Sequence, residues 1–291
     1  MMPEKFPLIV DIGRGSTEDG PGVRTTVFFK GCPLSCKWCQ NPETLDPQVE
    51  IGFYPKDCIG CFDCAIACSE DAILPEANVR IDRSKCARCA QCADICPGKG
   101  LRRIGNYYEV EELIEILLRD RVFYETSDGG VTLSGGEPTL WPGYCGELLR
   151  GLKANGIHTA VQTCGYFDYS AFEKELLPWI DLVMYDIKII GPEEHRQHTG
   201  RDNKKILENF IRLSKENIEL IPRVPLIPGF TTSEENLSGI SNFVRAGGIK
   251  ECSLLHYNPL GLSKWEHIGK AEPELPRCLP QNESEQSPGQ P

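Results

Sequence analysis

The chain has 291 residues, of which 40% are hydrophobic, so it can form a sizeable core in one large domain or two smaller ones. Its net charge of −11 argues against non-specific binding of nucleic acid, which needs a basic surface. No stretch approaches the roughly 20 apolar residues of a membrane-spanning helix, and residues 7–10 are too short for the apolar part of a signal peptide. We therefore expect a cytoplasmic protein that binds neither nucleic acid nor membranes.

The fifteen cysteines are the strongest compositional signal. A reducing cytosol makes disulfides a poor explanation, so metal binding is the better interpretation. Eleven of the fifteen lie between Cys32 and Cys96, and the other four have no ligand-like spacing: Cys145, Cys164, Cys252 and Cys278. Residues 50–105 hold eight acidic and eight basic side chains, so the whole excess of negative charge lies outside them. This contrast predicts that residues 50–105 form a separate module.

Predicted strands and helices alternate along most of the chain. β-Branched and aromatic residues predict a strand at 23–29, directly before the first cysteines. Helices are predicted at 109–119, 144–155, 169–177, 204–216 and 234–246. Five further strands are predicted at 131–133, 157–162, 180–187, 218–224 and 252–257. This α/β series predicts six parallel strands in a partial (β/α)6 TIM-like barrel. Residues 279–291 are rich in Pro, Gln, Ser and Glu, a composition typical of disorder.

One pattern of four cysteines, C-x2-C-x2-C-x3-C, occurs twice with an offset of 28 residues. It is the spacing of two-cluster bacterial ferredoxins, in which the fourth cysteine of each run ligates the other cluster. One predicted [4Fe–4S] cluster is therefore held by Cys58, Cys61, Cys64 and Cys96, and the second by Cys86, Cys89, Cys92 and Cys68. A pair of zinc knuckles is the alternative, although zinc sites normally use paired ligands. We expect a ferredoxin-type insert at 50–105 within a core made of residues 1–49 and 106–278.

A different spacing, C-x3-C-x2-C, follows the first predicted strand at Cys32, Cys36 and Cys39. Protein [4Fe–4S] clusters usually have four thiolates, so three leave one iron able to accept an outside ligand. Catalytic residues of βα barrels gather at the C-terminal ends of strands, where this loop is predicted to lie. The alternatives are three buried structural cysteines, or zinc with a distant fourth ligand. We predict that these three cysteines hold a catalytic cluster, the third in the chain.

The sequence of residues 31–43, GCPLSCKWCQNPE, resembles the signature of glycyl-radical-enzyme activating enzymes, a branch of the radical S-adenosylmethionine (SAM) superfamily. Residues 19–25, DGPGVRT, match the same branch, and the resemblance extends over residues 8–270. It implies an anaerobic enzyme that reductively cleaves SAM to a 5′-deoxyadenosyl radical. That radical removes a hydrogen atom from a backbone glycine of a partner glycyl radical enzyme. The implied electron donor is flavodoxin or ferredoxin, with the insert clusters as a relay, and we expect a monomer.

The resemblance also implies the SAM contacts, which are Trp38, Cys39, Gln40, Gly135, Gly136, Glu137, Asp186, Ile187, Lys188 and Asn258. In the family, the Gly-Gly-Glu-Pro element binds the amino group of methionine, the lysine pairs with the SAM carboxylate, and Arg223 corresponds to an arginine near the substrate peptide. Two positions depart from the pyruvate formate-lyase activating branch. Gln162 replaces an aspartate of a monovalent-cation site, and Asn258 replaces a histidine beside adenine.

Two other functions stay open from the residues alone. A multi-cluster electron carrier would explain the cysteines, but it needs neither the barrel nor Lys188. A radical SAM enzyme acting on a small molecule or on RNA is the other alternative. The negative charge argues against RNA, and Asp19-Gly20-Pro21-Gly22 favours the activating branch.

Overall fold

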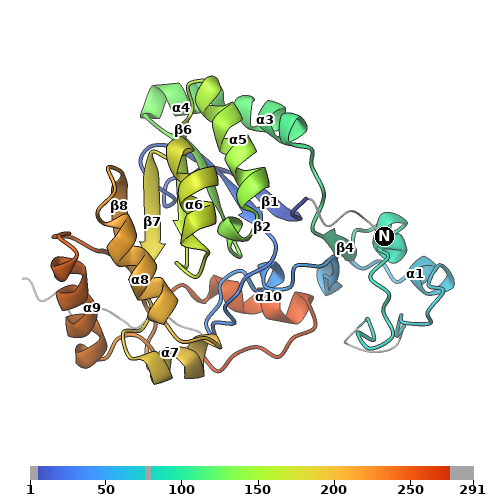
Figure 1. Cartoon of the computed structure of the whole chain (residues 1–291). Helices are drawn as coiled ribbons and strands as arrows, with labels where there is room; N and C mark the ends of the chain where they lie inside the picture. The colour runs from blue at the N-terminus through green and yellow to red at the C-terminus, as the bar shows by residue number, and fades with distance from the viewer. Residues whose placement is uncertain (1–5, 76–79, 276–291) are drawn as a thin grey trace, which may run out of the picture.

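A computed structural model describes residues 6–75 and 80–275 (Figure 1). Its main feature is a seven-stranded sheet whose first strand is antiparallel to the second, while the other six strands run parallel. In spatial order the strands are β1 (Ile9–Ser16), β2 (Arg24–Phe29), β5 (Gly130–Gly135), β6 (His158–Thr163), β7 (Leu182–Asp186), β8 (Glu219–Leu226) and β9 (Ser253–His256). The fold is a partial barrel.

Five helices cover one face of this sheet (Figure 1): α3 (Val110–Leu118), α5 (Pro142–Ala154), α6 (Tyr169–Glu175), α8 (Lys204–Leu213) and α9 (Glu234–Ala246). The other helices of the described residues are α1 (Asp63–Ile66), α2 (Gln91–Asp94), α4 (Arg121–Ser127), α7 (Pro192–Thr199) and α10 (Leu262–His267). Single 3-10 turns are η1 (Pro42–Thr44), η2 (Pro55–Asp57), η3 (Pro138–Leu140), η4 (Leu177–Trp179) and η5 (Pro259–Gly261). Within residues 6–75 and 80–275, no helix is long and apolar enough to cross a membrane.

The six predicted parallel strands and five predicted helices are confirmed, with ends that differ by a few residues. Strand β1 was not predicted, because its sequence IVDIGRGS includes two glycines and lacks a regular apolar alternation. Helix α7 was not predicted either, because PEEHRQHT has no apolar stripe. The predicted disorder at residues 279–291 lies outside the described residues.

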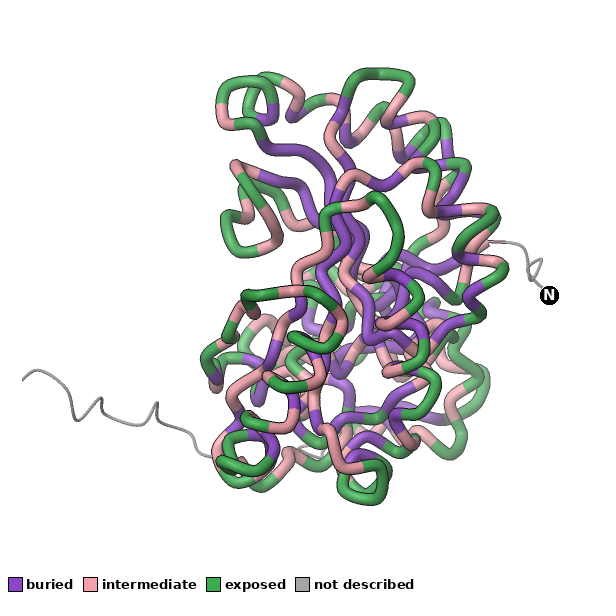
Figure 2. The backbone as a smooth tube through the Cα atoms, turned by 60° about the vertical axis from the view of Figure 1, so that its left-hand side comes forward, coloured by how far each residue is buried: buried purple, intermediate pink, exposed green. Residues whose placement is uncertain are grey.

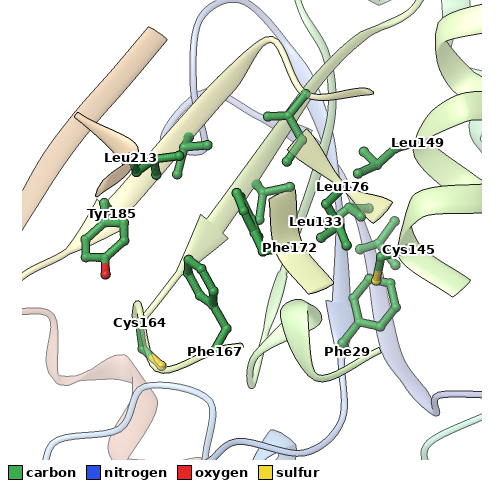
Figure 3. Close-up of a cluster of buried hydrophobic side chains, with 14 of the residues drawn as sticks. Phe29, Leu133, Cys145, Leu149, Cys164, Phe167, Phe172, Leu176, Tyr185 and Leu213 are labelled. Carbon is green, nitrogen blue, oxygen red and sulfur yellow. The ribbon is translucent and has the colours of Figure 1, made fainter. Parts of the chain in front are cut away.

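The core lies between the sheet and its helices, as the buried strands at the centre of Figure 2 show. In β5, Val131 and Leu133 are fully buried, as expected for a parallel strand covered on both faces. Figure 3 shows Phe29 and Leu133 from the sheet together with Leu149 of α5 and Phe172 of α6. The sheet is therefore held rigidly by large apolar side chains, and its strand ends are fixed relative to one another.

Residues 50–75 and 80–104 form a small unit beside the barrel, next to α10 (Figure 1). Strands β3 (Glu50–Phe53) and β4 (Leu101–Ile104) pair antiparallel at its base, and a second apolar cluster fills it. The 28-residue offset of the cysteines recurs in the backbone, because left-handed residues occur in matching pairs: Gly60 and Arg88, Phe62 and Ala90, Asp71 and Lys99. The bridge between Ile73 and Ile81 likewise corresponds to the pairing of Leu101 with Phe53. The sequence repeat is thus also a structural repeat.

A buried ion pair joins this unit to the barrel. Lys30 follows β2 and is fully buried, and its Nζ lies 2.6 Å from Oε2 of Glu50 and 2.7 Å from the Asp46 carbonyl. Lys270 lies 3.8 Å from the other oxygen of Glu50. Removing one partner of a buried pair leaves an uncompensated charge. We therefore expect Lys30→Met to lower the free energy of unfolding by about 3–5 kcal/mol, measured by urea titration of the iron-free protein.

The control for this prediction is Lys204→Met. Lys204 and Glu208 lie 3.9 Å apart with both side chains mostly exposed, so this change is expected to cost at most about 1 kcal/mol. Equal losses in the two variants would show that the Lys30–Glu50 pair does not stabilise the junction.

Candidate active site

A cavity of about 420 Å³ opens at the C-terminal ends of the parallel strands. Its wall takes residues from the loops after β2, β5 and β6 and from the ends of β7, β8 and β9. Ligand sites of α/β proteins lie at this edge of the sheet. Cys32, Cys36 and Cys39 all line the cavity, as the strand-then-loop pattern predicted.

The three-cysteine loop is held by backbone hydrogen bonds to the end of α7. The amide of Ser35 donates to the Thr199 carbonyl at 2.8 Å, and the amide of Lys37 donates to the His198 carbonyl at 3.0 Å. From the other side, the indole of Trp265 in α10 donates to the Cys39 carbonyl at 3.2 Å. The loop shape therefore depends on two short helices that come about 160 and 220 residues later in the chain.

The two glycines after β5 bring their backbone against the base of the cysteine loop. Gly135 has φ of +103°, and a Cβ there would lie 2.2 Å from the Phe29 nitrogen. A Cβ on Gly136 would lie 2.2 Å from the Gly31 carbonyl. The Glu137 amide donates to that same carbonyl at 2.8 Å. Only glycine fits this close approach, which sets the Gly-Gly turn beside Cys32 at the cavity wall.

Glu137 is fully buried and connects the ends of β5 and β6. Its Oε1 accepts hydrogen bonds from the Thr139 amide and from the hydroxyls of Thr139 and Thr163, at 3.2, 2.7 and 2.9 Å. Its Oε2 accepts from the Cys164 amide at 2.7 Å. Burial raises the pKa of the Glu137 carboxyl, and these hydrogen bonds oppose the rise. Glu137 therefore orders the loop from behind rather than lining the cavity.

Charged side chains gather at the ends of β7 and β8. Lys188 Nζ lies 3.0 Å from one oxygen of Asp186, and Arg223 Nε lies 3.2 Å from the other. Burial tends to raise the pKa of the Asp186 carboxyl, but Lys188 and Arg223 hold it below its usual value. All three side chains line the cavity, so its far wall carries a net positive charge suited to a carboxylate.

Comparison with known proteins agrees with this geometry. Residues 26–238 match the model of the Radical SAM superfamily. The chain is 40% identical over 274 residues to the isethionate sulfite-lyase activating enzyme of Desulfovibrio desulfuricans, covering 91% of this chain and 88% of the relative. It is 38% identical to the 4-hydroxyphenylacetate decarboxylase activating enzyme of Clostridium scatologenes, covering 90% and 86%, respectively. It is also 38% identical to the choline trimethylamine-lyase activating enzyme of Oleidesulfovibrio alaskensis, covering 92% and 89%.

The chain belongs to the radical SAM superfamily. Within it, the relatives above place the chain among the glycyl-radical-enzyme activating enzymes. The resemblance first noted in residues 19–25 and 31–43 is confirmed.

The family implies a [4Fe–4S] cluster and SAM, and the cavity fits both. Burial raises the pKa of the Cys36 thiol to about 12 and raises that of Cys39 as well. Iron supplies the positive charge that lets buried thiols ionise. Within the described ranges, no three Cys, His, Asp or Glu side chains converge on a point as ligands of one metal ion do. A cluster keeps its ligands further apart, because its own atoms lie between them.

Most of the predicted SAM residues share this cavity. The ones that line it are Trp38, Cys39, Gln40, Gly135, Gly136, Asp186 and Lys188. Ile187 lies behind the wall, 1% exposed, with its amide bonded to the Arg223 carbonyl. Trp38 packs against Phe230 with ring centroids 5.5 Å apart, so it has a structural contact as well. The roles of these residues remain predictions, whereas their positions are those expected at a shared strand edge.

Asn258 was predicted to contact SAM, but its side chain lies outside the cavity wall. Its Oδ1 accepts the Leu260 amide at 3.0 Å and caps η5, and its carbonyl accepts Gln40 Nε2 at 2.9 Å. The side chain of Asn258 is not part of the cavity wall, and His256 of β9 is. An asparagine directly before Pro259 favours such a cap, which explains why the side chain turns back to the backbone.

Sequence reasoning did not assign Asp19, Ser134 and Cys164 to the site, although all three line the cavity. Gln162 joins two of them, since its Nε2 donates to Asp19 Oδ1 at 2.6 Å and its Oε1 accepts from Ser134 Oγ at 2.7 Å. A hydrogen bond with Cys164 lowers the pKa of the Cys32 thiol, against the effect of burial. No local pattern predicts these contacts, because they join residues that are between 28 and 143 positions apart in the sequence.

The eight other cysteines gather in two groups inside the small unit. Cys58, Cys61, Cys64 and Cys96 surround one pocket, together with Arg80. In the other group, burial raises the pKa of Cys92 to about 11, and the nearby thiols of Cys86, Cys89 and Cys68 add to the rise. The pocket of the first run therefore takes its fourth cysteine, Cys96, from the second run, and Cys68 of the first run lies near Cys92. Their sulfurs accept backbone amides, Cys68 from Ala72 at 3.3 Å and Cys96 from Leu101 at 3.4 Å.

Proposed function

We propose that this chain uses three [4Fe–4S] clusters to activate a partner glycyl radical enzyme. A reduced cluster supplies one electron to SAM, which breaks the S–C5′ bond and yields methionine and a 5′-deoxyadenosyl radical. The radical takes a hydrogen atom from a backbone glycine of the partner, leaving 5′-deoxyadenosine and a glycyl radical. The observation that carries this function is the joint lining of one cavity by Cys32, Cys36, Cys39, Gly135, Gly136 and Lys188.

In this proposal the side chains bind, orient and shield the reactants rather than move protons. Lys188 and Arg223 attract the carboxylate of methionine, while the backbone of Gly135 and Gly136 approaches its amino group. The buried walls exclude water from the radical. Trp38 and His256 provide flat surfaces for adenine.

The class of partner follows from the relatives, but the individual partner does not. The three relatives are named as activators of a sulfite-lyase, a decarboxylase and a trimethylamine-lyase. The chain is similar to all three to nearly the same degree, so we propose a partner at the level of glycyl radical enzymes. We further propose that the protein is a cytoplasmic monomer that receives electrons from flavodoxin or ferredoxin.

Anaerobic reconstitution tests the function directly. The cluster-loaded protein is mixed with SAM, dithionite and one glycyl radical enzyme of each named type. We expect 5′-deoxyadenosine together with a glycyl radical signal in electron paramagnetic resonance (EPR) spectra for the matching partner. A protein that takes up electrons without forming 5′-deoxyadenosine would instead be an electron carrier. Formation of 5′-deoxyadenosine without a radical on any partner would point to a different substrate.

We propose that residues 50–105 form a ferredoxin-type domain whose two clusters relay electrons to the catalytic cluster. Its support is the pocket in which Cys96 joins the first three cysteines of the first run, together with the nearness of Cys68 to Cys92. The unit contacts the barrel through the Lys30–Glu50 pair and also through α10, where the rings of Tyr54 and His267 lie 4.3 Å apart.

The relay predicts that Cys61→Ala or Cys89→Ala slows SAM cleavage when flavodoxin is the reductant. Dithionite, a small molecule able to reach the barrel directly, is expected to restore much of the rate. The measurement is 5′-deoxyadenosine formed over time with each reductant. Equal rates for the variants and the parent with flavodoxin would mean that the insert clusters are structural.

A further inference from the structure

One guanidinium is built into the pocket formed by the first group of insert cysteines. Arg80 is 8% exposed and lines that pocket, and its Nη2 donates a hydrogen bond to Cys58 Sγ at 3.3 Å. Its Nη1 donates to the Pro75 carbonyl at 2.5 Å, and the rings of Phe53 and Phe62 lie 5.5 and 5.3 Å from its Cζ. The side chain is therefore held in one orientation, with its charge directed at sulfur.

The second group has no equivalent of Arg80. Beside the Ile73–Ile81 bridge, the amide of Leu74 donates to the Arg80 carbonyl, so these two residues face each other. In the pairing of β3 with β4, Gly52 faces Arg102 in the same way. Both pairs are related by the 28-residue repeat, so Gly52 occupies the position of Arg80. A Cβ on Gly52 would lie 2.9 Å from the ring of Tyr54, so a side chain there has no room.

Arg83, an arginine near the second group, acts differently. Arg83 lies near Cys86 and Cys92, but it also lies near Glu50, whose charge offsets its own. In the described part of the chain, the Nε atoms of Arg80 and Arg83 are both buried without a partner, but only Arg80 donates a hydrogen bond to a cysteine sulfur. Arg80, by contrast, has no carboxylate partner among the described residues. Among the described residues, its closest polar contacts are the Cys58 sulfur and the Pro75 carbonyl.

A positive charge and a hydrogen bond at a cluster sulfur both stabilise the reduced cluster, which carries one more negative charge. We propose that Arg80 makes one insert cluster accept the electron before the other, namely the cluster held by Cys58, Cys61, Cys64 and Cys96. This inference rests on the proposed function, because it requires a cluster in each group. The two identical cysteine patterns do not indicate which cluster is reduced first, whereas the position of Arg80 does.

The test uses the full chain with Cys32, Cys36 and Cys39 all replaced by alanine, so that only the insert clusters contribute. The clusters are reconstituted anaerobically, and their reduction is followed by EPR during a potentiometric titration. We expect two distinct midpoint potentials in this parent. In Arg80→Gln the higher of the two should move to a more negative value, while the lower one stays. The matched control is Arg102→Gln, since Arg102 pairs with Asp57 and the Tyr54 ring rather than with sulfur, and it should move neither.

A second variant covers the case in which Arg80→Gln loses a cluster. Arg80→Lys keeps the charge but lacks the planar fork of donors, so we expect a smaller shift of the same potential in the same direction. Unchanged potentials in the Arg80 variants, or a shift of the lower potential instead, would overturn the assignment. A parent that binds no cluster iron would overturn the proposed two-cluster insert itself. The iron content of the parent thus separates the two failures.

Discussion

Replacing Cys36 by alanine is expected to abolish SAM cleavage while leaving the insert clusters in place. Cys36 is the most buried of the three loop cysteines and lies in the wall of the main cavity. With Cys36 replaced, the catalytic cluster keeps only two of its three loop thiolates, Cys32 and Cys39. The eight insert cysteines belong to a separate unit with its own apolar core, so their clusters should still assemble.

Three measurements check this prediction. The iron content should fall from about twelve to about eight atoms per chain, since each cluster holds four. The 5′-deoxyadenosine formed with dithionite should fall to the level of a reaction without protein. The EPR signals of the insert clusters should remain. Cys252→Ala is the control, because Cys252 is a half-buried thiol outside the cavity. Undiminished SAM cleavage in Cys36→Ala would contradict the assignment of the catalytic cluster.

Replacing Glu137 by alanine is expected to damage both stability and SAM binding. The change leaves the amides of Thr139 and Cys164 without the acceptor that they have at 3.2 and 2.7 Å. A buried donor without a partner costs about 1–3 kcal/mol, so the free energy of unfolding should fall by about 2–6 kcal/mol. The Gly135–Gly136 turn would also lose its support, which should weaken SAM binding.

Urea unfolding of the iron-free protein measures the first effect, and equilibrium binding of SAM to the loaded protein measures the second. The matched control is Glu147→Ala on α5. Glu147 is more than half exposed and lies 3.9 Å from Arg150, so its loss should change the stability by less than about 1 kcal/mol. If Glu137→Ala costs no more than Glu147→Ala, the buried carboxylate does not hold the two strand ends together.

Cys36 and Glu137 differ in whether the sequence or the folded structure reveals their neighbours. The ligand cysteines lie within eight residues of one another, so their spacing was visible in the chain itself. Two partners of Glu137, Thr163 and Cys164, lie at the end of the next strand of the sheet, and only the structure shows these contacts.

The sequence by itself determined the classes of the elements, the cysteine spacings and the family. The six parallel strands follow from runs of apolar and β-branched residues, because a strand buried on both faces tolerates little else. The pairing of Cys96 with the first run and Cys68 with the second was predicted from the spacing alone. The structure brings Cys96 into the pocket of the first run.

Only the tertiary structure decided which side chains meet at the strand ends. Gln162 contacts both Asp19 and Ser134, because the sheet places β6 beside β5 and the chain before β2 lies close to both. The side chain of Asn258 accepts the Leu260 amide, whereas His256 lines the cavity. A local cap therefore takes the side chain of Asn258 away from the ligand site. The Arg80–Cys58 contact likewise became visible only in the structure. It occurs in one repeat and not in the other, where Gly52 occupies the position of Arg80. Spacing along the chain specifies ligands that are neighbours in sequence, whereas packing specifies what surrounds them.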